Sequence, residues 1–81
     1  MLVLPAHIKA TRAKANAFAH EGMQLHGFEA DDHLAWSIFY NACLAYLQRS
    51  SHLTNKKHGT ALARVYELAA ERATKRTDLL G

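Results

Sequence analysis

Residues 33–47, HLAWSIFYNACLAYL, decide the fold of this chain. A helix formed from this segment is apolar almost all the way round. The segment contains the only Trp and the only Cys of the 81 residues, with one of the three Phe and two of the three Tyr. Such a helix is either covered by its own chain or in contact with another molecule. A chain this short has little material with which to cover it.

The segment before it also has the pattern of a helix, predicted over residues 5–26. Pro5 suits the first turn, where its missing N–H leaves no hydrogen bond unmade. Apolar or small side chains then recur at spacings of three and four residues. Gly27 is typical of the residue that follows a helix, and Phe28 is expected to fold back on Met23 as in a Schellman ending.

The apolar segment itself is predicted to form a helix over residues 32–50. Asp31 and Asp32 supply its N-cap and a negative charge in its first turn, where the helix dipole favours carboxylates. The joints on both sides of this helix are short, and short joints favour antiparallel neighbours.

A third helix is predicted over residues 55–77, with Thr54 or Asn55 as its N-cap. The sequence therefore predicts an all-α fold, a single helical domain over residues 1–81. Its architecture is an up-down-up three-helix bundle, with dimerisation through the middle helix as a further source of stability. The side chains predicted to face the core are Ile8, Thr11, Ala15, Phe18, Ala19, Gly22 and Leu25 in the first helix, and Ala61, Leu62, Val65, Leu68, Ala69 and Ala73 in the third, with Tyr66 and Arg72 at the edges.

On a helical wheel the middle helix has two apolar arcs, separated by a narrow polar stripe of Ser37, Asn41 and Gln48. The first arc has small and branched side chains, which suit close packing within the bundle: Leu34, Ile38, Ala42 and Ala45. The second arc is mostly aromatic: Trp36, Phe39, Tyr40, Cys43, Tyr46 and Leu47. We expect two neighbouring helices to leave part of this second arc uncovered.

We therefore predict a protein interface on the second arc, because Trp and Tyr bury large rings at binding hot spots while keeping one polar atom for a partner. Three occupants fit the sequence: the core of the chain itself, a second copy in a homodimer, and a different protein. The predicted function is that of a small non-catalytic interaction module. It would act as an adaptor, inhibitor or regulator, of the kind that phages and plasmids use as accessory factors.

The alternative function is DNA binding by a small basic regulator that uses the third helix. The net charge is +3 with His neutral. The basic residues of this region are Lys56, Lys57, Arg64, Arg72, Lys75 and Arg76, and the first helix adds Lys9, Arg12 and Lys14. Against this alternative, Glu67 and Glu71 interrupt the outer face of the third helix, and the turn SSHLTN lacks the glycine typical of a recognition turn.

Six histidines raise the question of a metal site, but their spacing does not favour one. The segment HEGMQ at residues 20–24 is not HExxH, and His20 and His26 diverge by about 120° on a 3.6-residue period. One weak candidate for a metal site, with oxygen and nitrogen ligands, spans the first joint and consists of His26, Asp31, Asp32 and His33. We predict no metal, cofactor or small-molecule substrate. The sequence lacks a Ser–His–Asp order and a Gly-rich phosphate loop, so it also predicts no enzyme activity.

Cys43 is the only cysteine, and its place inside the apolar helix indicates a small buried hydrophobic residue. Without a disulfide framework the expected compartment is the cytoplasm. The N-terminal MLVLP lacks the basic region and the long apolar region of a signal peptide. No segment approaches the ~20 apolar residues of a membrane span, so no membrane partner is predicted.

Overall fold

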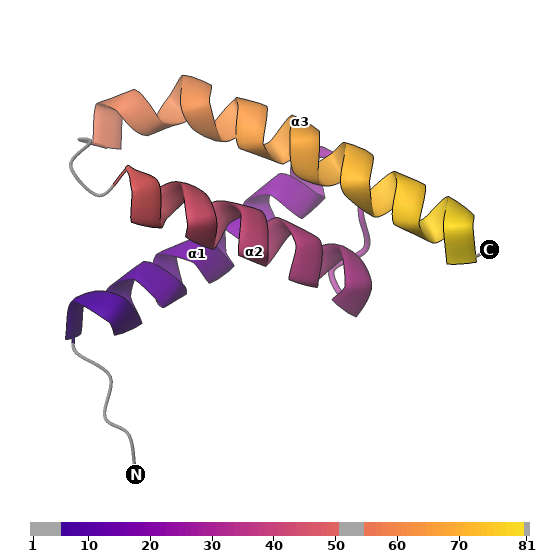
Figure 1. Cartoon of the computed structure of the whole chain (residues 1–81), viewed down its shortest axis with the longest axis horizontal. Helices are drawn as coiled ribbons and strands as arrows, with labels where there is room; N and C mark the ends of the chain where they lie inside the picture. The colour runs from indigo at the N-terminus through magenta and orange to yellow at the C-terminus, as the bar shows by residue number, and fades with distance from the viewer. Residues whose placement is uncertain (1–5, 51–54, 81) are drawn as a thin grey trace, which may run out of the picture.

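The structure is a computed structural model that describes the backbone of residues 6–50 and 55–80 and the side chains of residues 10–50 and 59–76. This part of the chain forms three helices and no strand, which confirms the predicted all-α, three-helix arrangement (Figure 1). The helices are α1 (Ala6–Leu25), α2 (His33–Arg49) and α3 (Asn55–Leu80).

The central helix of the packing is α2. It contacts both other helices extensively, whereas α1 and α3 contact each other much less. In Figure 1, α2 and α3 run antiparallel, and α1 crosses obliquely behind α2. The axis of α1 is therefore not aligned with the other two, as it would be in a regular bundle, and the face of the α2–α3 pair turned away from α1 is left open.

The end of α1 is a Schellman motif, as the sequence predicts. Gly27 has a φ of 80°, a conformation that strains residues with a Cβ. The N–H of Phe28 donates to the carbonyl oxygen of Met23 at 2.8 Å, and that of Gly27 donates to the carbonyl oxygen of Gln24 at 3.2 Å. The motif turns the chain sharply and brings Phe28 towards α2, where its ring lies 5.5 Å from that of Phe39.

The start of α2 is capped by Asp32, whose Oδ1 accepts from the N–H of Ala35 at 3.0 Å. The helix begins at His33, so Asp31 precedes the cap instead of lying in the first turn. At the other joint, α3 begins at Asn55 and continues to Leu80, beyond the predicted end near residue 77. Two residues of these predictions lie outside the described part of the chain: Pro5, predicted for the first turn of α1, and Thr54, one of the two predicted caps of α3.

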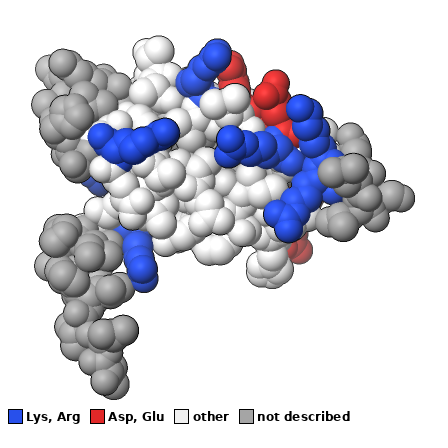
Figure 2. Space-filling model, in the orientation of Figure 1, with Lys and Arg blue, Asp and Glu red and all other residues white. Residues whose placement is uncertain are grey.

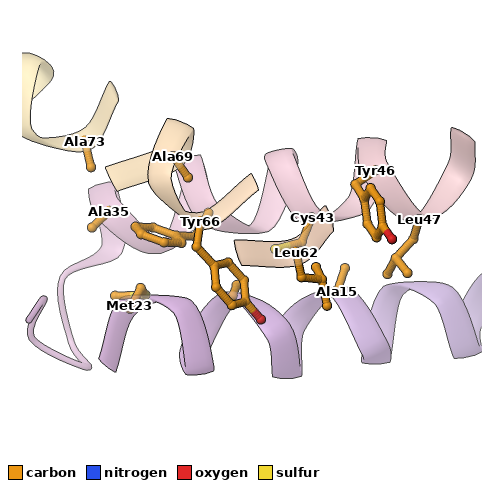
Figure 3. Close-up of a cluster of buried hydrophobic side chains, with 12 residues drawn as sticks. Ala15, Met23, Ala35, Cys43, Tyr46, Leu47, Leu62, Tyr66, Ala69 and Ala73 are labelled. Atoms are coloured by element: carbon orange, nitrogen blue, oxygen red, sulfur yellow. The ribbon is translucent and has the colours of Figure 1, made fainter. Parts of the chain in front are cut away.

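The core lies where α2 is enclosed between α1 and α3 (Figure 3). Its largest fully buried side chains are Phe39, Met23 and Cys43. The remaining buried hydrophobic residues are Ala15 and Ala19 in α1, Ala35, Tyr46 and Leu47 in α2, and Leu62, Tyr66, Ala69 and Ala73 in α3. Large side chains on α2 therefore face many small ones on its neighbours, the arrangement that fills space between closely spaced helices.

This pairing of large with small side chains overturns the expected division of α2 into a packing arc and an exposed arc. The small-residue arc predicted to pack is partly open, with Ala45 exposed and Leu34, Ile38 and Ala42 half-buried. Most of the aromatic arc is buried instead. The expectation assumed that small residues would pack against small ones, whereas the alanines of α1 and α3 leave room for the rings of α2.

Two predicted core positions are also wrong. Leu25 is 68% exposed and Leu68 is 44% exposed, whereas Met23 and Tyr66 are buried. The buried face of each helix is thus rotated from the predicted stripe. Its position is set by the oblique crossing of α1 and by the ring of Tyr66, which lies against Gly22.

Candidate functional site

The aromatic edge of α2, which we define as Trp36, Tyr40 and their α1 neighbours Asn16 and His20, is the first candidate surface. The rings of Trp36 and Tyr40 are stacked, with centroids 4.9 Å apart and an interplanar angle of 20°. Both side chains are half-buried. Their spacing of four residues places them on the same face of α2, one turn apart.

Side chains of α1 hold this stacked pair in place. The indole N–H of Trp36 donates to Oδ1 of Asn16, with 2.9 Å between Nε1 and Oδ1. The ring of His20 lies 6.5 Å from that of Trp36. The hydrogen bond also means that the polar atom of Trp36 is already engaged within the chain. A partner would therefore meet fixed ring surfaces, at a reduced cost in side-chain entropy.

The other predicted interface residues lie in the core of this chain. Phe39, Cys43, Tyr46 and Leu47 are all buried, so the fold brings only two of the six predicted residues to the surface. Burial also raises the pKa of the Cys43 thiol to about 11, so Cys43 is protonated and unreactive near neutral pH.

The α2–α3 groove, on the opposite edge of α2, is the second candidate surface. Its volume is ≈ 330 Å³. From α2 it is lined by Ile38, Asn41, Ala42 and Ala45, and from α3 by Arg72 and Arg76. The sequence contained part of the signal for it, since Arg72 and Arg76 are four residues apart and share a helix face. It gave no indication that Ala42 and Ala45 would stay partly open.

The charged side chains of α3 lie on different sides of the helix, with Arg72 and Arg76 at the α2–α3 groove and Lys75 beside Glu67 and Glu71. Arg64, Arg72, Lys75 and Arg76 are exposed, as are Glu67 and Glu71. Both glutamates line a cavity of ≈ 530 Å³ beside His26 and Phe28, away from the α2–α3 groove. In Figure 2 several basic side chains gather over the C-terminal half of α3, with acidic side chains along one border and an uncharged surface along the other.

Of the residues predicted for DNA binding, Lys56 and Lys57 have side chains outside the described part, as does Lys9. Arg12 and Lys14 are exposed on α1. The described basic residues of α3 do not share one face, because Arg72 and Arg76 line the groove while Lys75 lines the cavity with the glutamates.

Among the described residues, no group of three or more His, Cys, Asp and Glu side chains is placed to hold a metal ion. The grouping around His26 and His33 is thus not assembled. No helix in the described part of the chain is long and apolar enough to cross a membrane.

Tyr66 has a buried hydroxyl that makes no hydrogen bond to the described part of the chain. Burial raises its pKa above the ordinary tyrosine value, and the charges of Glu21 and Cys43 raise it further. The hydroxyl therefore stays protonated. Tyr66 belongs to the hydrophobic core of the chain.

Comparisons of the chain with protein-family models, with curated proteins and with solved structures found no match.

Proposed function

We propose that this chain is a small non-catalytic protein-interaction module that binds another protein through the aromatic edge of α2. The observation that carries the proposal is the stacked, half-buried pair of Trp36 and Tyr40, fixed by the hydrogen bond to Asn16. Rigid aromatic side chains contribute large contact areas at little entropic cost, which is why they are common at binding hot spots.

The proposal is narrower than the sequence-based prediction. Burial of four of the six predicted residues supports a contact made by Trp36 and Tyr40 and not by the whole arc. We place the module in the cytoplasm, where a lone reduced cysteine such as Cys43 is ordinary. An adaptor or inhibitor, such as a phage or plasmid accessory factor, needs no more than such a surface.

The test is quantitative capture from extracts of the source organism with tagged wild type and two variants. Tyr40→Ala removes one ring from the aromatic edge and leaves the Trp36–Asn16 hydrogen bond unchanged. Leu25→Ala is the matched control, because Leu25 is more exposed than Tyr40. It also lies on the opposite side of α1 from Asn16, since nine residues rotate the helix by two and a half turns. Circular dichroism confirms that both variants are folded.

We expect one protein to bind wild type and Leu25→Ala equally and to bind Tyr40→Ala about tenfold more weakly, as for loss of a hot-spot aromatic. Sedimentation of the purified proteins shows whether the bound protein is a second copy of this chain. If the folded Tyr40→Ala variant retained every interaction of wild type, the aromatic edge would not be the binding surface.

A further inference from the structure

We propose a second docking site, in the α2–α3 groove, for an acidic amphipathic helix of a partner protein. The site lies on the opposite edge of α2 from Trp36 and Tyr40, so it goes beyond the surface proposed above. Three features of the groove point to this occupant: the chemistry of its floor, the charge of its wall and the room left beside it by the oblique crossing of α1.

The floor of the groove, formed by α2, is mostly apolar: Ile38, Ala42 and Ala45 are apolar, and the fourth lining residue, Asn41, is polar and exposed. Ile38 and Ala42 are half-buried and Ala45 is exposed, and all three line the groove. Alanines allow the backbone of an incoming helix to approach closely, and Ile38 provides a branched side chain to fit between the side chains of that helix. An amphipathic helix docks in such a groove through its apolar stripe.

The wall of the groove is positively charged. Arg72 and Arg76 are exposed and one helical turn apart, and no carboxylate is among the described residues that line the groove with them. Like charges at this spacing repel each other in the free protein. Glutamate or aspartate side chains along one border of a docked helix would relieve the repulsion, and each guanidinium can bind a carboxylate through two hydrogen bonds.

The arrangement of the helices leaves room for a helical occupant. Because α1 crosses behind α2, the α2–α3 pair has an open face in Figure 1, and a helix lying along the groove would pack against both. A second copy of this chain, docked groove to groove, would bring no carboxylate from the described lining of its own groove to meet the arginines. Duplex DNA would be attracted by the arginines, but it would not use the apolar floor.

The test uses a fluorescein-labelled synthetic peptide as the probe, with a helical stripe of Leu and Ala bordered by Glu. Fluorescence anisotropy measures its binding to the full chain. The neutral control peptide has Gln at every Glu position. The charge-reversed variant is Arg72→Glu with Arg76→Glu. Its matched control is Arg64→Glu with Lys75→Glu, which changes the net charge equally on the same helix outside the groove.

We expect saturable binding of the Glu peptide to wild type, weakened at least about tenfold by reversal of Arg72 and Arg76 and less than about twofold by reversal of Arg64 and Lys75. Ala45→Phe, which fills the groove, should weaken peptide binding as much as reversal of Arg72 and Arg76 does. Tyr40→Ala should leave it unchanged, so the result is independent of the aromatic edge.

Four results would overturn the docking site. The first is no saturable binding of the Glu peptide, or equal binding of the Gln peptide. The second is equal weakening by both charge-reversed variants, which indicates attraction by net charge alone. The third is loss of peptide binding in Tyr40→Ala, which places the peptide on the aromatic edge. The fourth is binding of labelled duplex DNA that is lost on reversal of Arg72 and Arg76 but not of Arg64 and Lys75, which identifies a nucleic-acid site instead.

Discussion

Gly22 of α1 lies directly against the ring of Tyr66 of α3. A Cβ on residue 22 would stand 2.6 Å from Cδ1 and 2.9 Å from Cε1 of that ring, and 3.0 Å from Cδ1 of Phe39. The absence of a side chain at this position therefore allows an aromatic residue from each of the other two helices to contact α1. All three helices meet at this point.

We predict that Gly22→Ala lowers the free energy of unfolding by about 1–3 kcal/mol, the usual cost of overpacking. Alanine favours a helix over glycine by about 1 kcal/mol, so a net loss would show that the clash outweighs the gain in helix propensity. The control is Gly59→Ala in α3, where an added Cβ meets nothing within 4 Å. Urea unfolding should find Gly59→Ala neutral or more stable; a stabilising Gly22→Ala would contradict the close contact.

Tyr66→Phe should stabilise the protein by about 1 kcal/mol, because the buried hydroxyl has no hydrogen-bond partner among the described residues and so carries an uncompensated desolvation cost. The ring, which makes the contacts with Gly22 and Phe39, is retained. Tyr40→Phe serves as the control, since Tyr40 is only half-buried and should change stability little. Thermal unfolding measures both variants, and a lower melting temperature for Tyr66→Phe would reveal a partner for the hydroxyl.

The free energy of unfolding should fall as the solution becomes alkaline, and ionisation of the Cys43 thiol should be the first cause. Its folded pKa is raised to about 11 from 9.0, so the unfolded chain loses this proton first. The contribution is fully present below pH 9 and is lost as pH rises through about 11, with a slope of up to about 1.4 kcal/mol per pH unit. Urea unfolding from about pH 9 to about pH 9.5, where the tyrosines of the unfolded chain stay mostly protonated, measures it with little contribution from Tyr66. Cys43→Ala should flatten the slope, and an unchanged slope would exclude the thiol as its source.

Asp32→Ala should lower stability by about 1 kcal/mol, because it removes the side chain that accepts from the Ala35 N–H at the start of α2. The neighbouring Asp31→Ala has the same change in charge but lies before the cap, so its effect should stay within about 0.5 kcal/mol. Chemical denaturation of the two variants compares them directly. Equal effects would mean that charge near the helix start, and not the cap, provides the stabilisation.

The features predicted correctly from the sequence depend on near neighbours in the chain. Gly27 and Phe28 indicated the Schellman ending, and Asp32 indicated the N-cap, because each forms hydrogen bonds within a few residues. Periodicity likewise indicated three helices. These signals require no knowledge of how the helices cross.

The features that were missed depend on contacts between helices. The sequence shows that α2 has two apolar arcs, but which arc is buried depends on the crossing of α1 and on the fit of Phe39 and Tyr66 around Gly22. A wheel of a single helix does not contain that information. The α2–α3 groove was missed for the same reason, since Ala42 and Arg72 belong to different helices and become neighbours only in the fold.

The most direct test of the central claim, that the aromatic edge of α2 contacts a partner protein, is site-specific photo-cross-linking in the source organism. A photoreactive benzoylphenylalanine replaces Tyr40 in one experiment and Leu25 in the other. We predict one discrete cross-linked protein from position 40 and none from position 25, although Leu25 is the more exposed. Cross-linking from position 25 alone, or an identical set of products from both positions, would contradict the account.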